Sequence, residues 1–174
     1  PLPASVNGSL EGLKAGARGV LLLEPRATGA EQEEKADLLG VCASLRRIFT
    51  DSIPEAELRA FILRNGVRLA VVLAGTPRAL AEELFEIAQE EASSYAGLTL
   101  SAAVGSEVAG NEEIPLSFKE AESTLSHRMY LGLGRLIHPD ECGSSEEERG
   151  IQLSVEGVAD ALVTGAGRQI AEHL

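Results

Sequence analysis

The sequence predicts an α+β domain in which helices pack against an antiparallel sheet. Apolar stretches of strand length alternate with longer segments whose apolar residues recur at the helical period. The pair Asn65-Gly66 separates two of the apolar stretches, and such a pair is typical of the tight turn of a β-hairpin. Hydrophobic residues make up 44% of the chain and aromatic residues only 3%, so the core must be built from aliphatic side chains.

A buried strand and a long helix are expected first. Residues 19–23 form a short, continuous apolar run that predicts the strand, which Glu24 and Pro25 end. Thr28 and Glu31 have the spacing of a capping box, so a helix should follow. The apolar stripe of this helix consists of Leu38, Val41, Cys42, Leu45, Ile48 and Phe49.

A β-hairpin and a second helix are expected next. Residues 61–64 and 67–73 are apolar runs on either side of the Asn-Gly pair, and both residues of that pair tolerate the positive φ of a type I′ turn. Thr76 followed by Pro77 predicts a helix start, with threonine as the cap and proline in the first turn. Residues 98–104 alternate in character and predict a further strand.

A third helix and a short strand complete the predicted domain. Ser117 and Glu120 form a second capping-box pattern, which predicts a helix from Ser117 to about Met129. Residues 135–137 predict the short strand. The β-α-β-β-α-β order of the preceding elements is typical of a ferredoxin-like core, whose antiparallel sheet carries its helices on one face.

Charge and cysteine content narrow the classes of function. The net charge is −12, with 27 acidic and 15 basic residues, so the chain itself should repel nucleic acid. No apolar run approaches the roughly 18 residues of a membrane span. Two cysteines, Cys42 and Cys142, are too few for a disulfide framework. We therefore expect a cytoplasmic protein without a membrane partner.

Few residues are arranged for catalysis or metal binding. The run from His138 to Cys142 contains potential ligands, but Pro139 restricts which of them could converge. Gly105 and Gly110 have the first spacing of a P-loop, yet the lysine and hydroxyl residue that such a loop requires are missing. The residues alone therefore predict no catalytic site, no metal site and no cofactor.

The hairpin resembles a known family. Residues 63–73 resemble the signature hairpin of GGDEF domains, the diguanylate cyclases, in which the turn reads Gly-Gly-Asp-Glu-Phe and an apolar strand follows. The five matching positions are Asn65, Gly66, Val67, Arg68 and Leu69. The second glycine and the apolar last position are kept, whereas valine and arginine replace the two acidic residues.

These replacements affect the chemistry that the resemblance implies. Cyclases of this type use carboxylates to hold two metal ions that clamp a triphosphate. Val67 has no ligand atom, and Arg68 repels cations. Glu24 falls near the family's other metal carboxylate, which follows the first strand, but one carboxylate does not rebuild the site. We therefore expect no cyclase activity, and Glu24 is kept only as part of a candidate ligand cleft.

A second pattern points to bacterial regulators. Val104-Gly105 and, after a polar loop, residues 114–125 resemble the pattern VG…LxxSxxEAxxAL of their degenerate GGDEF-like domains. Residues 127–134 are similar to a stretch of the YesN-type response regulators of the AraC family. In those proteins a receiver domain precedes the GGDEF-like domain, and two helix-turn-helix units follow it. Regulators of the PucR/CdaR type carry a similar domain and are the nearest alternative.

The resemblance divides the chain into three parts. Residues 1–16 are expected to be a linker or a frayed N-terminal segment, and residues 17–142 a degenerate GGDEF-like domain. Residues 143–174 are expected to be an acidic linker and a helix that lead to a DNA-binding domain outside this chain. The chain starts at Pro1 and its only methionine is Met129, so we expect it to be a segment of a longer protein.

The implied function is that of a non-catalytic signal-transducing or dimerisation module. Its parent would be a bacterial transcription regulator, a two-component response regulator of the AraC family. A homodimer is expected, because dimers read paired half-sites in DNA. The alternative is a ligand-sensing domain that binds a nucleotide or another small molecule in the vestigial cyclase cleft. Catalysis is the third interpretation, and Val67 and Arg68 count against it.

Overall fold

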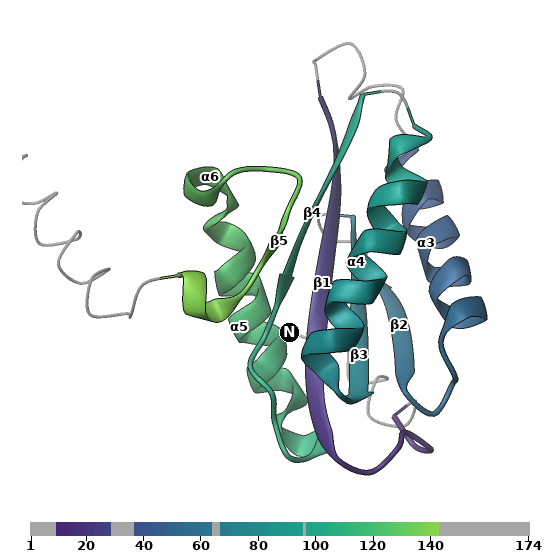
Figure 1. Cartoon of the computed structure of the whole chain (residues 1–174), viewed down its shortest axis with the longest axis vertical. Helices are drawn as coiled ribbons and strands as arrows, with labels where there is room; N and C mark the ends of the chain where they lie inside the picture. The colour runs from purple at the N-terminus through teal and green to yellow at the C-terminus, as the bar shows by residue number, and fades with distance from the viewer. Residues whose placement is uncertain (1–9, 29–36, 64–66, 96, 143–174) are drawn as a thin grey trace, which may run out of the picture. The chain divides into compact units, whose positions relative to one another are not determined.

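The computed structural model shows the chain as two units, which are described separately (Figure 1). Residues 1–139 form the first unit and residues 140–174 the second. The structure describes residues 10–28, 37–63, 67–95 and 97–142. Within these ranges, no helix is both long and apolar enough to cross a membrane.

A five-stranded sheet forms the centre of the first unit. Its strands, in spatial order, are β2 (Leu58–Leu63), β3 (Arg68–Gly75), β1 (Ala17–Ala27), β4 (Leu98–Val104) and β5 (Leu136–Ile137). The first four are antiparallel, in the order expected of a ferredoxin-like core. The predicted antiparallel sheet is therefore confirmed for these strands. It becomes mixed at its edge, because the chain returns from the helices after β4 and pairs β5 parallel to that strand.

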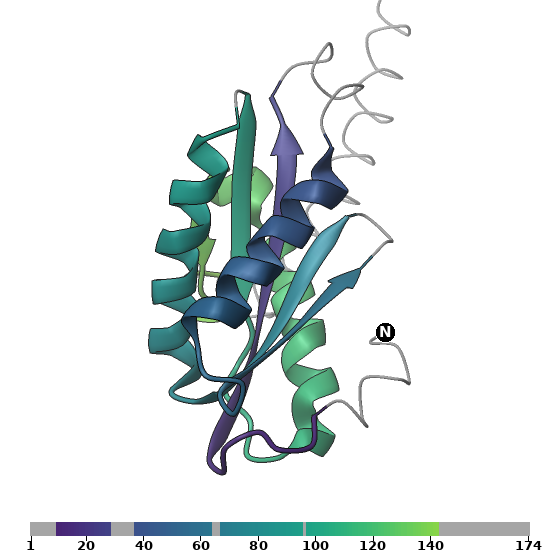
Figure 2. The ribbon, with the colours of Figure 1, turned by 90° about the vertical axis from the view of Figure 1, so that its right-hand side faces the viewer.

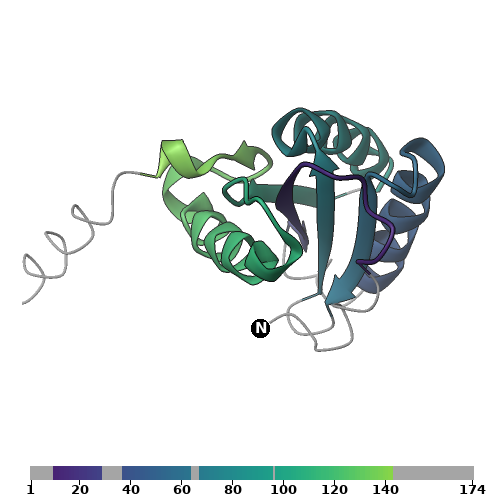
Figure 3. The same cartoon turned by 90° about the horizontal axis from the view of Figure 1, so that it is seen from below.

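Helices cover both faces of this sheet, as Figures 1 and 3 show. The two helices of the ferredoxin-like order, α3 (Leu38–Ser52) and α4 (Pro77–Ser93), share one face, as predicted. The third helix, α5 (Ile114–Ser126), packs against β1 and β4 on the opposite face and is followed by the short α6 (Arg128–Leu131). The 3-10 turns are η1 (Asn111–Glu113) and η2 (Pro139–Glu141).

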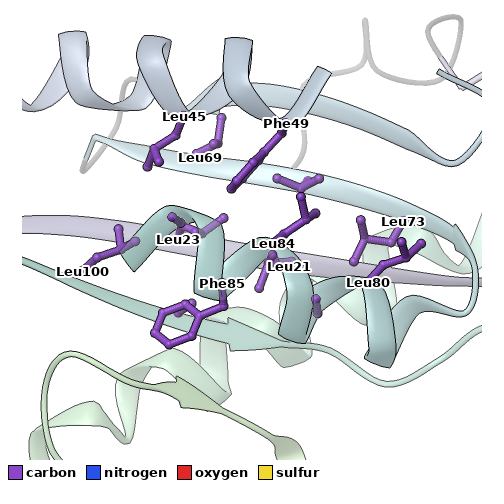
Figure 4. Packing of buried hydrophobic residues seen from close by; sticks show 14 of the residues in the cluster. Leu21, Leu23, Leu45, Phe49, Leu69, Leu73, Leu80, Leu84, Phe85 and Leu100 are labelled. Atoms are coloured by element: carbon purple, nitrogen blue, oxygen red, sulfur yellow. The ribbon is translucent and has the colours of Figure 1, made fainter. Parts of the chain in front are cut away.

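The central strand sends side chains into both layers of the core. Leu21 and Leu23 pack with Phe49 in the cluster beneath α3 and α4, which Figure 4 shows. Val20 and Leu22 alternate with them and lie toward α5. All four strand residues are 0% exposed. A strand that is buried on both faces explains why this part of the sequence is a continuous apolar run.

β1 is longer than predicted, and Pro25 does not end it. The strand continues two residues beyond Pro25, which has a register partner on β4. β3 pairs with β1 only as far as Leu23, so in the described part of the sheet the missing N–H of Pro25 breaks no ladder on that side. As a result, Glu24 and Arg26 lie in regular strand and point to the same face, the one that α5 covers.

The first predicted capping box is wrong for α3. This helix begins after Asp37, whose carboxylate accepts a hydrogen bond from the backbone N–H of Gly40 at 2.9 Å. The hydroxyl of Thr28 instead donates to the carbonyl of Gly97 at 2.8 Å. Glu31, the other half of the predicted box, lies outside the described residues. The aspartate closest to the apolar stripe therefore caps the helix.

The second predicted capping box is also wrong, because Ser117 lies inside α5. The helix begins three residues earlier, with Pro115 in its first turn. The Ser117 hydroxyl accepts a hydrogen bond from the backbone N–H of Val20 at 3.0 Å. A Cβ atom placed on Gly105 would lie 1.9 Å from the carbonyl oxygen of Ser117, so the helix can approach β4 only because residue 105 is glycine. The glycine and the serine of the VG…LxxSxxEAxxAL pattern are therefore explained by the packing of α5 against the sheet.

Candidate functional site

The hairpin that carries the family resemblance is formed by β2 and β3, which lie side by side in Figure 2. Leu63 and Arg68 form the last described residue pair of this hairpin. The turn itself lies outside the described residues. Val67 is the first residue described after it, and its φ of 45° is unusual for a β-branched side chain.

The pairing of β3 with β1 places the hairpin arginine beside the strand glutamate. Leu69 is 0% exposed in the core and is the register partner of Leu23. Arg68 precedes Leu69 and Glu24 follows Leu23, so both side chains point away from that core and toward α5. Two positions that are 44 residues apart in the sequence are thereby brought together.

Glu24 lies at the centre of a group of arginine side chains. It is only 4% exposed. One of its carboxylate oxygens accepts a hydrogen bond from Nε of Arg26 at 2.6 Å and lies 2.9 Å from a terminal nitrogen of Arg128. The other oxygen accepts a hydrogen bond from Nε of Arg68 at 2.7 Å. These short contacts between ionised groups are among the stronger polar interactions in proteins.

Two further contacts connect this group to the helices on the α5 face. Arg68 donates to the carboxylate of Glu122 on α5 at 3.4 Å. Arg128, the first residue of α6, has a side chain that is only 10% exposed and donates to the carbonyl of Leu125 at 2.8 Å. These contacts tie β1 and β3 to α5 and α6. The five residues, named here the Glu24 cluster, are Glu24, Arg26, Arg68, Glu122 and Arg128.

Burial and the arginine charges act in opposite directions on the Glu24 carboxyl group. Burial raises its pKa, but hydrogen bonds from Arg26 and Arg68 and the charge of Arg128 lower it, and the resulting pKa lies below the ordinary value of 4.5. Burial also lowers the pKa of Arg128, which the Glu24 charge raises and the two other arginines lower further. Glu24 is therefore ionised at neutral pH and surrounded by cations.

The residues present do not fit the pair of metal ions that the family resemblance implies. Both oxygens of Glu24 already accept hydrogen bonds from guanidinium groups, and Val67 offers no ligand atom. Arg68 puts a fixed positive charge where a metal ion would need the carboxylate. In the part of the chain that the structure describes, no group of three His, Cys, Asp or Glu residues is placed to hold a metal ion.

Sequence reasoning missed three members of the Glu24 cluster. Arg26 stands two residues after Glu24, a spacing that puts both on one face of a strand, but the strand was expected to end at Pro25. Glu122 and Arg128 belong to the patterns at residues 114–125 and 127–134, which were noted for their resemblance and not for their charges. A signal was present for all three, but only the continuation of β1 beyond Pro25 and the packing of α5 and α6 bring them to the Glu24 cluster.

The described elements define an α+β domain with a mixed five-stranded sheet and helices on both faces. Residues 14–127 match the family described as "GGDEF-like domain". The chain belongs to this family. A comparison with curated proteins found no match.

Two solved structures are similar to this chain. The first is the active GGEEF domain of a diguanylate cyclase from Vibrio cholerae, with a TM-score of 0.51 and 14% identity over 70% of this chain and 82% of that one. The second is the GGDEF domain of DgcB from Caulobacter crescentus in complex with c-di-GMP, with a TM-score of 0.49 and 13% identity over 72% and 79% of the two chains. The similarity to the first shows a shared fold.

Proposed function

We propose that this chain is a non-catalytic signal-transducing and dimerisation module of a bacterial transcription regulator. One observation carries the non-catalytic part: the guanidinium of Arg68 is bonded to the buried carboxylate of Glu24. The motif named in the Vibrio cholerae cyclase, GGEEF, has glutamate at its third and fourth positions. The corresponding positions here are Val67 and Arg68, and a carboxylate neutralised by arginine is not available to a metal ion.

The sequence patterns after β4 support a parent of the AraC family with a two-component receiver domain. In such a protein the Glu24 cluster would give the signal a physical route, because it joins the hairpin to α5 and α6. DNA would be bound by a domain beyond this chain, whose own net charge is −12. This function belongs in the cytoplasm. A regulator of the PucR/CdaR type is the alternative parent.

Incubation with GTP and either Mg²⁺ or Mn²⁺ tests the non-catalytic part of the proposal. We expect no cyclic di-GMP, measured by chromatography with an active diguanylate cyclase as the positive control. A Glu24→Gln variant serves as the matched control, because any true product should fall when the one carboxylate near a metal-binding position of the family is removed. Product formation by the unaltered chain that is lost in this variant would contradict the proposal.

Sedimentation velocity over a range of concentrations tests dimerisation. A reversible monomer–dimer equilibrium is expected, and a chain that stays monomeric at the highest concentration would contradict the proposed dimerisation.

The sequence of the parent gene tests the proposal that the module belongs to a transcription regulator. Two helix-turn-helix units after residue 174 support the AraC type, a single terminal unit supports the PucR/CdaR type, and a parent without any DNA-binding domain contradicts both.

A further inference from the structure

The Glu24 cluster contains more positive than negative charge. Its three arginines face two carboxylates, those of Glu24 and Glu122. One positive charge is therefore left uncompensated within the cluster, in a chain whose net charge is −12. Such a local excess of the opposite sign in an acidic protein attracts anions.

The outer part of the cluster keeps hydrogen-bond donors available. Arg26 bonds to Glu24 through Nε, and neither of its terminal nitrogens has a partner among the described residues. One terminal nitrogen of Arg68 is in the same situation, since Nε and Nη1 take the two carboxylates. The two side chains are 50% and 25% exposed, so both reach solvent.

The inner part of the cluster holds these groups in place and adds to the positive potential. The Arg128 side chain is 10% exposed, and its buried Nε has no hydrogen-bond partner in the described structure. The charges of Arg26 and Arg68 help to lower the pKa of Arg128, as expected where like charges are close together. An added anion would relieve this repulsion, whereas an added cation would increase it.

We propose that the guanidinium groups of Arg26 and Arg68 form a binding site for the carboxylate or phosphate group of a small anionic molecule. Guanidinium groups recognise both oxyanions through paired N–H···O bonds. The site would bind an anion directly with arginine, without a metal ion between the protein and the ligand. This inference goes beyond the proposed function and gives the module a ligand input, but the module could dimerise and transmit a signal without it.

Thermal unfolding with citrate or inorganic pyrophosphate, at ionic strength matched with NaCl, tests the site and distinguishes the two ligand chemistries. Matching is needed because added salt alone screens the repulsion within an acidic chain. We expect at least one of the two anions to raise Tm by about 3–6 °C at roughly ten times its Kd. Arg26→Gln should weaken binding about tenfold or more. Arg46→Gln, on the exposed side of α3, should leave it unchanged.

The signals of the arginine Nε–Hε groups in the unaltered protein give an independent measurement by NMR. Those of Arg26 and Arg68 should shift most with the anion, and that of Arg46 should not move. The proposal is overturned if neither anion changes Tm or these signals, or if Arg26→Gln responds as the unaltered protein does. None of these results depends on dimerisation or on GTP turnover, so failure of this site is distinguishable from failure of the proposed function.

Discussion

At the scale of single residues, the carboxylate of Glu24 is the group around which the three arginines of the Glu24 cluster gather. Glu24→Gln keeps the shape of the side chain but leaves three guanidinium groups around a neutral amide. We expect the free energy of unfolding at pH 7 to fall by about 2–4 kcal/mol, measured by urea denaturation. Glu83→Gln on the exposed side of α4 is the control and should change the free energy of unfolding by less than about 0.5 kcal/mol.

The pH dependence of stability gives a second prediction for Glu24. Its pKa is lower in the folded state than the ordinary value of 4.5, so the folded state favours the ionised carboxylate. The resulting stabilisation is complete above the pKa of the unfolded chain and is lost as the pH falls through the lower folded pKa. We expect urea unfolding to show a loss of stability below about pH 4.5 that is smaller in Glu24→Gln. Identical acid profiles for the two proteins would contradict the assignment.

The two cysteines should differ strongly in reactivity. Burial of the Cys42 side chain on the core-facing side of α3 raises the pKa of its thiol from 9.0 to about 11, so about a hundredfold less of it is thiolate at a given alkaline pH. Cys142 is partly exposed. With a disulfide reagent at pH 8, one thiol per folded chain should react, and peptide mapping should identify it as Cys142. Cys42 should react only in denaturant, and rapid labelling of Cys42 in the folded chain would count against this packing.

At the scale of elements, Ser117 joins α5 to the central strand. Ser117→Ala removes the acceptor of the buried Val20 N–H. The unpaired donor should cost about 1–3 kcal/mol of unfolding free energy, measured by denaturant unfolding. Ser123→Ala lies on the exposed side of the same helix and serves as the control for the change in helix propensity. Equal losses of unfolding free energy in the two variants would show that the hydrogen bond between the Val20 N–H and the Ser117 hydroxyl does not stabilise the fold.

The sequence predicts the elements well where local chemistry decides them. The Asn65-Gly66 pair predicts a hairpin, and β2 and β3 are antiparallel neighbours on either side of it; Thr76-Pro77 marks the start of α4. The capping-box prediction for Ser117 is wrong because the Ser-x-x-Glu spacing of a helix cap can also occur inside a helix, where the serine contacts a sheet. Its hydroxyl bonds to a strand 97 residues away, and no local pattern encodes such a partner.

Most of the Glu24 cluster could not be predicted for the same reason. The family motif identifies Glu24 and Arg68 separately, the first as a carboxylate and the second as an unsuitable metal ligand. Their pairing depends on the register of β1 against β3, and the contribution of Arg128 depends on the end of α5. Long-range strand pairing and helix placement are set by tertiary packing, which periodicity alone does not specify.

At the scale of the whole molecule, the packing of the aliphatic core does not depend on the charges of the Glu24 cluster. The two layers around β1 preserve a fold shared with an active cyclase at 14% identity. The Glu24 cluster lies at the end of β1, outside that apolar cluster, so its charges can change without altering the packing of α3 and α4. Side chains near the C-terminal end of β1 can therefore differ between proteins that share this fold while the aliphatic core is kept.

The net charge of the chain makes a prediction about the proposed homodimer. Each copy carries a charge of −12, so two copies repel one another at long range whatever surface they share. Added salt shortens the range of this repulsion to about 8 Å at physiological ionic strength. Dimerisation should therefore tighten as NaCl rises from low to physiological concentration, measured by sedimentation velocity. Weakening over this range would instead mean that oppositely charged groups at the interface dominate over the net repulsion. A neutral osmolyte at matched osmolality is the control, because it changes crowding without screening charge.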